Sequence, residues 1–276
     1  MALIDVPTLA LQLAGADPPT VIDVRWRLGG PPGREGYIAG HIPGASFLDL
    51  DAELCGPPGA SGRHPLPDPA VLEKALRTAG VRTGHPVVVY DGGDGQAAAR
   101  LWWTLRWAGH NEVAVLDGGF AAWVEAGRPV EPGTATPRPG DIEVKPGGMP
   151  VLDAVGAGAM AVDGVLVDAR VAPRYRGEME PVDPVAGHIP GAVNLPAARL
   201  ADEAGRLRTT HELRGIFADA GVPPGPVGAY CGSGVTAAQT VLALHLAGYD
   251  NPALYVGSWS EWCHDRIRPI ALGETA

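Results

Sequence analysis

Short, mainly apolar runs alternate with amphipathic segments along the whole chain. Such runs are typical of strands buried on both faces, and they predict strands at residues 20–24, 87–90, 113–116, 165–168, 227–230 and 253–256. Apolar positions three and four apart predict helices at residues 7–13, 70–79, 97–108, 211–220 and 236–247, and one more that starts at Phe120. This alternation predicts an α/β fold in which a parallel sheet carries helices on both faces.

The second half of the chain repeats the first. The sequence GHIPGA at residues 40–45 recurs unchanged at 187–192. Three further blocks match in the same order: residues 21–25 with 166–170, 88–92 with 228–232, and 116–123 with 255–262. Blocks this far apart predict two duplicated domains rather than a solenoid. We place these at residues 1–130 and 151–276, joined by a linker at 131–150 with five prolines and four glycines.

Composition limits the partners and the compartment. The net charge of −10 argues against nucleic acid or an anionic membrane as the main partner. The three cysteines include no CxxC pair, so they predict neither a disulfide framework nor a zinc site and suit a reducing compartment. Residues 1–15 lack the basic region of a signal peptide, and no apolar stretch reaches the ~18 residues of a membrane span. We therefore expect a cytoplasmic protein that spans no membrane.

One cysteine stands where parallel sheets present their chemistry. The loop CGSGVT, residues 231–236, follows a predicted strand and opens a predicted helix, and ligands bind at the carboxyl ends of such strands. Backbone N–H groups and the helix dipole at this turn favour the thiolate of Cys231, the form that attacks. The alternative is a small buried hydrophobe, a common fate of a lone cysteine. We expect that ordinary role for Cys55 and Cys263.

Three features occur together in this chain: the duplicated GHIPGA, an Asp-x-Arg after the first strand of each half, and a single CGSGVT loop. The chain thereby resembles the two-domain rhodanese sulfurtransferases over essentially its whole length. The resemblance implies tandem rhodanese-like domains with one active site, located between them. The first domain is then an inactive copy, with Asp91 where the second has Cys231. The duplicated Asp168 and Arg170, like Asp23 and Arg25, are expected to be structural rather than catalytic, as a buried ion pair or a hydrogen-bonded turn.

The resemblance also implies an enzymatic reaction. Cys231 takes the outer sulfur of a donor, becomes a persulfide and passes that sulfur to a thiophilic acceptor, without a metal or an organic cofactor. Backbone N–H groups of the loop would cradle the anionic sulfur, and they belong to Gly232, Ser233, Gly234, Val235 and Thr236. The hydroxyl of Thr236 either caps the following helix or contacts the persulfide. Acceptors left open include cyanide, glutathione, thioredoxin and a protein carrier, and we expect a monomer.

The loop bears on the choice of donor. Neutral residues at positions 232 and 233 resemble the 3-mercaptopyruvate branch, whereas thiosulfate-preferring members carry two basic residues there. A mercaptopyruvate donor leaves as an enolate that needs a proton. The resemblance assigns this proton to Ser233, with His64 and Asp51 as the matching relay residues. The alternative for His64 is a surface position in a loop rich in proline and glycine.

A donor must also be held by its anionic end. Arg174 matches the family arginine that binds the donor's carboxylate or sulfonate. The mercaptopyruvate branch has a second arginine a few residues later, where this chain has Asp183. Since the thiosulfate branch has Asp near that position, the donor stays open between 3-mercaptopyruvate and thiosulfate. Arg176 is one candidate to replace the missing arginine.

Two functions of other classes fit the sequence less well. Cysteine phosphatases of related fold need His-Cys-x₅-Arg, but Tyr230 precedes the cysteine here and Ala237 stands at the arginine position, which argues strongly against that activity. A non-catalytic rhodanese-like binding module is the other alternative. The intact cysteine loop favours the enzyme.

Overall fold

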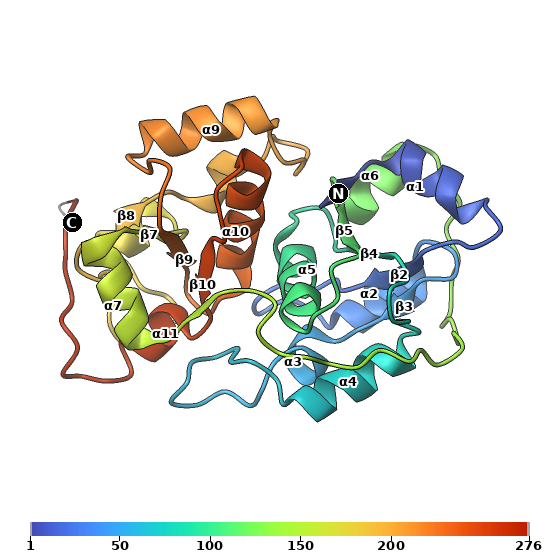
Figure 1. Cartoon of the computed structure of the whole chain (residues 1–276), viewed down its shortest axis with the longest axis horizontal. Helices are drawn as coiled ribbons and strands as arrows, with labels where there is room; N and C mark the ends of the chain where they lie inside the picture. The colour runs from blue at the N-terminus through green and yellow to red at the C-terminus, as the bar shows by residue number, and fades with distance from the viewer. Residues whose placement is uncertain (1, 275–276) are drawn as a thin grey trace. The chain divides into compact units, whose positions relative to one another are not determined.

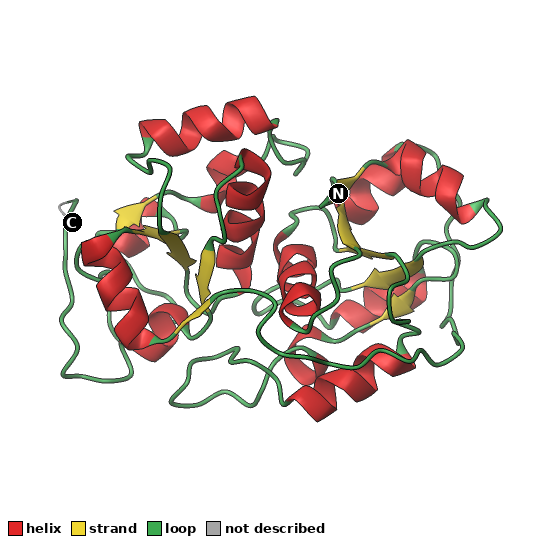
Figure 2. Ribbon diagram, viewed as in Figure 1, coloured by secondary structure: helices red, strands yellow, loops and turns green. Residues whose placement is uncertain are grey.

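The computed structural model describes residues 2–274 and contains two five-stranded sheets with the same topology (Figures 1 and 2). Their strand orders are β1-β5-β4-β2-β3 and β6-β10-β9-β7-β8, and every neighbouring pair is parallel. The strands are β1 (Leu3–Ile4), β2 (Thr20–Asp23), β3 (Ser46–Phe47), β4 (Val87–Tyr90), β5 (Val113–Leu116), β6 (Val151–Leu152), β7 (Val165–Asp168), β8 (Val193–Asn194), β9 (Val227–Tyr230) and β10 (Ala253–Tyr255). The predicted α/β fold with a duplicated parallel sheet is confirmed.

Helices lie on both sides of each sheet, with α9 and α10 on one side of the second sheet and α7 and α11 on the other (Figure 1). The helices of the first half are α1 (Val6–Leu13), α2 (Gly33–Ala39), α3 (Leu50–Glu53), α4 (Pro69–Thr78), α5 (Gln96–Trp107) and α6 (Gly119–Glu125). Those of the second are α7 (Ala154–Asp163), α8 (Ala172–Tyr175), the 3-10 helix η1 (Ala197–Leu200), α9 (Thr210–Asp219), α10 (Val235–Ala247) and α11 (Ser258–Trp262). No helix in residues 2–274 is long and apolar enough to cross a membrane.

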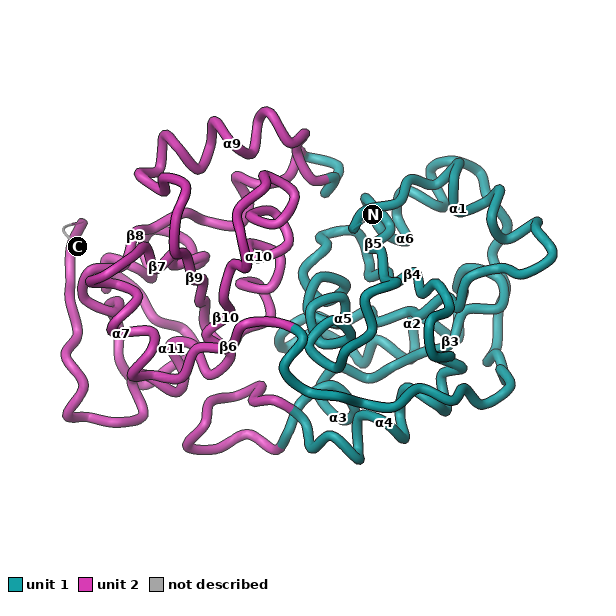
Figure 3. The backbone as a smooth tube through the Cα atoms, in the orientation of Figure 1, with its two compact units in different colours: residues 1–56, 67–148, 203–206 teal, residues 57–66, 149–202, 207–276 magenta. Residues whose placement is uncertain are grey.

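The chain forms two compact units, and each contains one sheet (Figure 3). Unit 1 holds the residues up to 56, residues 67–148 and residues 203–206; unit 2 holds residues 57–66, 149–202 and those from 207 on. The segment 57–66 is therefore part of unit 2 although it precedes α4 of unit 1. This exchange places His64 in the same compact unit as Cys231.

The pattern of apolar residues did not predict α7, because its small residues obscure the helical period. Gly156 and Gly158 interrupt an alanine-rich stretch that reads as a loop. Asp153 starts the helix by accepting a hydrogen bond from the Gly156 N–H at 2.7 Å. A Cβ at Gly158 would lie 3.5 Å from the ring of Trp262. The helix therefore faces a buried tryptophan at this glycine, with room for a Cβ in ordinary contact.

The duplicated Asp-x-Arg forms the predicted ion pair in both units. Arg170 donates to Asp168 at 2.6 Å and to the carbonyl of Gly187, in the second GHIPGA, at 2.7 Å. Arg25 donates to Asp23 at 2.7 Å and to the carbonyl of Gly40 at 2.6 Å. Each pair therefore ties the end of a strand, β2 or β7, to the first glycine of a GHIPGA motif.

Unit 1 fills its own cysteine-equivalent loop with a carboxylate. Asp91 accepts hydrogen bonds from the N–H groups of Gly93, Gly95 and Ala98, at 2.9, 3.1 and 3.1 Å. Residues 203–206 cover the same loop, since a Cβ at Gly205 would lie 1.8 Å from the Gly93 carbonyl oxygen. Burial, followed by the charge of Asp94, raises the pKa of Asp91 to about 6 even though these N–H groups act to lower it. The amides that hold an anion are already satisfied here.

Replacing Asp91 by asparagine should change how stability depends on pH. The folded protein holds the Asp91 proton more tightly than the unfolded chain, because the folded pKa of about 6 exceeds the ordinary value of 3.8. The free energy of unfolding of the wild type should therefore rise relative to that of Asp91→Asn as the pH falls from about 7 to 4, by on the order of 2 kcal/mol. Urea unfolding of both proteins across this range measures the difference. Asp163→Asn, at an exposed aspartate, is the control, and a pH-independent difference at Asp91 would contradict the account.

Candidate active site

Cys231 follows β9 directly and lies buried, with 3% of its surface exposed. Its Sγ accepts a hydrogen bond from the Gly234 N–H at 3.2 Å, within the loop that leads to α10. Gly234 has a φ of 80° and is the N-cap of α10, so Thr236 lies in the first turn and the suggestion that it caps the helix is wrong. The left-handed φ is a conformation that glycine adopts without strain. The loop thereby turns a backbone donor toward the sulfur.

Ser258 holds this loop in place by hydrogen bonds, a role that the sequence analysis did not predict. Its hydroxyl accepts the Cys231 N–H at 3.2 Å and donates to the Tyr255 carbonyl at 2.8 Å. Its φ of 54° is unusual for a residue with a side chain. The matching residue in the first half is Gly119, with a φ of 57°. A serine aligned with a glycine in the repeat was the signal that could have identified this position.

His64 and Ser233 meet, although the two residues are far apart in the sequence. His64 Nδ1 lies 2.8 Å from Ser233 Oγ, and both residues are buried. The alternative of a surface histidine is therefore wrong. Gly62 allows the approach of this segment: its φ is 99°, and a Cβ there would lie 2.6 Å from the Gly257 carbonyl oxygen. The Arg63 N–H then donates to Ser260 Oγ at 3.1 Å.

The predicted third member of the relay, Asp51, is on α3 of unit 1. Its carboxylate accepts a hydrogen bond from the indole N–H of Trp26 at 2.9 Å. The part of Asp51 in the relay stays a prediction.

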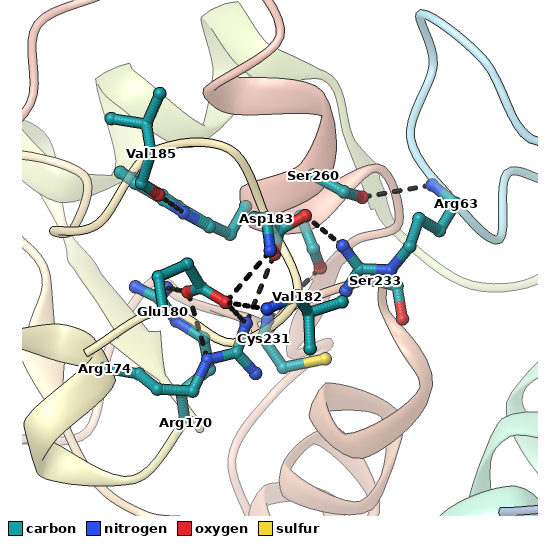
Figure 4. A network of polar contacts seen from close by, with 12 residues as sticks. Arg63, Arg170, Arg174, Glu180, Val182, Asp183, Val185, Cys231, Ser233 and Ser260 are labelled. Atoms are coloured by element: carbon teal, nitrogen blue, oxygen red, sulfur yellow. Dashed lines mark hydrogen bonds and ion pairs between the residues drawn. The ribbon is translucent and has the colours of Figure 1, made fainter. Parts of the chain in front are cut away.

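Arg174, the predicted donor anchor, is on α8 and is held by two acidic side chains (Figure 4). Its Nε and Nη2 donate to the carboxylate of Glu180 at 3.0 and 2.6 Å, in the forked geometry of an arginine–carboxylate pair. Its Nη2 also lies 3.2 Å from Asp183 Oδ2. Glu180 in turn contacts Arg170 Nη1 at 3.4 Å. Arg174 is thus connected to the structural ion pair at the end of β7.

A second guanidinium lies over the same loop and was missed from the sequence. Arg63 pairs with Asp183 (Figure 4). A Cβ at Gly232 would lie 2.8 Å from Arg63 Nη2 and 3.5 Å from Arg174 Nη1. The position of Arg63 next to His64 in the sequence was the available signal. Arg176, the candidate suggested earlier, is instead paired with Glu178 at 2.7 Å and Glu274 at 3.4 Å.

The two carboxylates of this cluster differ in how readily they hold a charge. Burial acts to raise the pKa of Glu180, but hydrogen bonds from Arg174 and from the N–H of Asp183 outweigh it, and the pKa lies below the usual value. Burial raises the pKa of Asp183, helped by the charge of Glu180, and this outweighs the lowering by Arg63 and Arg174. The environment therefore favours the charged form of Glu180 and disfavours the charged form of Asp183.

Burial affects the thiols of the other two cysteines, Cys55 and Cys263. All three cysteines are free and buried, but burial, with a contribution from Asp183, raises the pKa of Cys263 to about 11. Burial also raises the pKa of Cys55. Both therefore stay protonated at neutral pH. Within residues 2–274, no group of three or more His, Cys, Asp or Glu side chains is placed to hold a metal ion.

Comparison with known proteins agrees with this arrangement. The model of the rhodanese-like domain matches residues 6–126 and 152–265. A thiosulfate sulfurtransferase by name, SseB of Mycobacterium tuberculosis, is 44% identical over 98% of this chain and 97% of its own. A Pseudomonas aeruginosa protein with the name of a 3-mercaptopyruvate sulfurtransferase is 45% identical, over 99% and 98%. The crystal structure of SseA from Escherichia coli, described with 3-mercaptopyruvate sulfotransferases, is 34% identical with a TM-score of 0.82 and covers 94% of this chain and 99% of that one.

The chain therefore belongs to the rhodanese-like family. It is a two-sheet, tandem-domain sulfurtransferase, as the sequence predicted.

Removing one arginine from each copy of the ion pair should separate stability from donor binding. Arg170→Ala leaves Asp168 buried without its partner and releases Glu180, so it should cost about 3–5 kcal/mol in the free energy of unfolding and raise the KM for donor. Arg25→Ala breaks the matching pair in unit 1, where Arg25 is more exposed. That control should destabilise less and leave KM unchanged. Urea unfolding and steady-state kinetics measure both; equal KM values for the two variants would refute the link to Arg174.

Proposed function

We propose that this sulfurtransferase takes its sulfur from 3-mercaptopyruvate, with Cys231 as nucleophile and persulfide carrier. The observation that carries the proposal is the 2.8 Å contact between His64 and Ser233, in the loop of Cys231. Through this contact, Ser233 and His64 can deliver the proton that a carbon leaving group needs. The name of the Pseudomonas aeruginosa relative points to the same donor.

The first half-reaction forms a sulfur–sulfur bond and breaks a carbon–sulfur bond. The Cys231 thiolate attacks the donor sulfur, and the electrons of the carbon–sulfur bond pass to the pyruvate enolate. The Ser233 hydroxyl gives a proton to the enolate carbon, and His64, protonated on Nδ1, replaces it. We include Asp51 as the residue that orients His64. Pyruvate leaves, and Cys231 holds the sulfur as a persulfide.

The second half-reaction returns the cysteine. A nucleophilic acceptor, cyanide or a thiolate, attacks the outer sulfur of the persulfide, and the electrons of the sulfur–sulfur bond return to Cys231. The Gly234 N–H, 3.2 Å from Sγ, is placed to stabilise that thiolate. We assign the same duty to the N–H groups of the remaining loop residues, namely Gly232, Ser233, Val235 and Thr236.

The anionic end of the donor is assigned to Arg174. A forked guanidinium binds a carboxylate through two parallel hydrogen bonds. Arg174 lies over the loop of Cys231, since a Cβ at Gly232 would lie 3.5 Å from Arg174 Nη1. We therefore assign the donor carboxylate to Arg174 and the donor sulfur to Cys231.

Thiosulfate is the second candidate donor, because Arg63 supplies a cation beside Gly232 that the sequence pattern did not predict. SseB of Mycobacterium tuberculosis carries that name. A thiosulfate donor releases sulfite, which needs no proton on carbon, so Ser233 and His64 would have no chemical step to perform. We favour mercaptopyruvate for this reason.

We further propose that the protein acts as a cytoplasmic monomer, with thioredoxin among its acceptors.

Replacing the relay residues should affect the two donors differently. Ser233→Ala and His64→Ala should lower kcat with 3-mercaptopyruvate about 10²–10⁴-fold, the usual contribution of a positioned acid. With thiosulfate, which leaves without protonation, the same variants should retain most of their turnover. Steady-state assays with cyanide as common acceptor measure both.

Two controls make this comparison specific. Cys231→Ser should abolish turnover with either donor, and His211→Ala, at an exposed histidine on α9, should change neither. Equal losses with both donors would show that Ser233 and His64 shape the loop rather than deliver a proton. A wild type that prefers thiosulfate would overturn the donor assignment.

A further inference from the structure

The space over Gly232 is shared by two guanidinium groups. A Cβ built at this glycine would lie 2.8 Å from Arg63 Nη2 and 3.6 Å from Arg174 Nη2. Both cations therefore overlie the residue that follows the nucleophile. The mercaptopyruvate branch resembled here has an arginine where this chain has Asp183. In this chain Arg63, from a different segment, lies over the loop.

One carboxylate already bridges this pair of arginines. Asp183 contacts Arg63 through Oδ1 and Arg174 through Oδ2, the second at 3.2 Å. Its side chain is only 3% exposed. A carboxylate between two guanidinium groups is also the arrangement that the anionic end of an α-keto acid would adopt. Asp183 thus occupies the kind of position in which a donor anion would bind.

The side chain of Asp183, rather than its backbone, is the part that can move, because the N–H groups of Val182 and Asp183 each donate to Glu180 Oε1 at 3.1 Å. Asp183 lies after α8 in a stretch without helix or strand, between Pro181 and Pro184. Its neighbours Met179 and Val182 are 47% and 41% exposed. Glu180, by contrast, is anchored to both Arg170 and Arg174. A rotation of the Asp183 side chain can therefore release the arginines while the backbone of residues 182–183 keeps its hydrogen bonds to Glu180, the carboxylate that positions Arg174.

Charge balance favours a donor with a single negative charge at this end. The cluster joins three guanidinium groups to three carboxylates, namely Arg63, Arg170, Arg174, Asp168, Glu180 and Asp183. A donor carboxylate that displaces Asp183 keeps this balance, whereas a dianion leaves an excess negative charge in a half-buried site. Burial raises the pKa of Asp183, which means that the site destabilises the charged form of its carboxyl.

We propose that Arg63 is the second donor-binding arginine and that Asp183 is an internal counter-anion which the carboxylate of the donor displaces. This inference rests on the proposed function and deepens it. It names a pair of residues that determines donor specificity. Arg63 adds a binding contact, and Asp183 holds the two guanidinium groups in place while competing with every anion that enters.

Binding of pyruvate, the expected product, tests this inference apart from catalysis. The full chain with Cys231→Ser serves as background, and isothermal titration with pyruvate and with sulfite measures Kd. Asp183→Asn should tighten pyruvate binding about tenfold, because the competing charge is gone while an amide oxygen still faces the arginines. Arg63→Ala should weaken it at least tenfold, and Arg63→Lys should fall between, since it keeps the charge without the fork.

The matched control is Arg176→Ala, an arginine of the same segment that pairs with Glu178, and it should leave both Kd values unchanged. Unchanged pyruvate binding in Arg63→Ala or Arg63→Lys would overturn the role of Arg63. Weaker binding in Asp183→Asn would show that Asp183 only positions Arg63 and does not compete. The Cys231→Ser protein without a second substitution could bind sulfite but not pyruvate. If Arg63→Ala then weakens sulfite binding, the mercaptopyruvate proposal fails while the role of Arg63 stands.

Discussion

A chain of alternating charges that starts in a buried ion pair holds this site together. Arg170 is bound to Asp168 at the end of β7 and also contacts Glu180, and Glu180 holds Arg174. Beyond Arg174 the chain continues through Asp183 to Arg63. Every charge between the two ends has an opposite charge on both sides, so burial leaves none of them uncompensated. The strand therefore fixes the position of an arginine at the loop of the nucleophile.

The two copies of the fold show how little has to change to make or remove an active site. Both present a glycine-rich loop after the central strand of a parallel sheet, and both carry the Asp–Arg pair. In unit 1 the loop amides bind the carboxylate of Asp91, which belongs to the loop itself. In unit 2 the Gly234 amide faces the sulfur of Cys231. The loop of unit 1 thus binds its own carboxylate, whereas the loop of unit 2 holds the thiol of Cys231.

Local pattern predicted the features that depend on local chemistry. The strands 87–90, 113–116, 165–168 and 227–230 formed as expected, because runs of apolar residues bury both faces of a parallel sheet. The resemblance placed His64 near Ser233, and the structure brings these side chains into contact. Arg63 and Ser258 were missed because their roles depend on backbone approaches across the chain, such as that of Gly62 to Gly257. Sequence alone also could not show that Asp183, an acid at an unexpected position, is paired with two arginines.

The central claim is that one cysteine of three carries the transferred sulfur, and peptide mass mapping tests it directly. The wild-type chain is treated with 3-mercaptopyruvate in the absence of any acceptor, its free thiols are blocked, and the three cysteine peptides are compared. The account predicts the gain of one sulfur atom on Cys231 alone, because the Gly234 N–H is placed to stabilise its thiolate, whereas burial raises the pKa of both Cys55 and Cys263. Sulfur on either of these two cysteines with Cys231 unmodified, or no sulfur on any peptide, would contradict it.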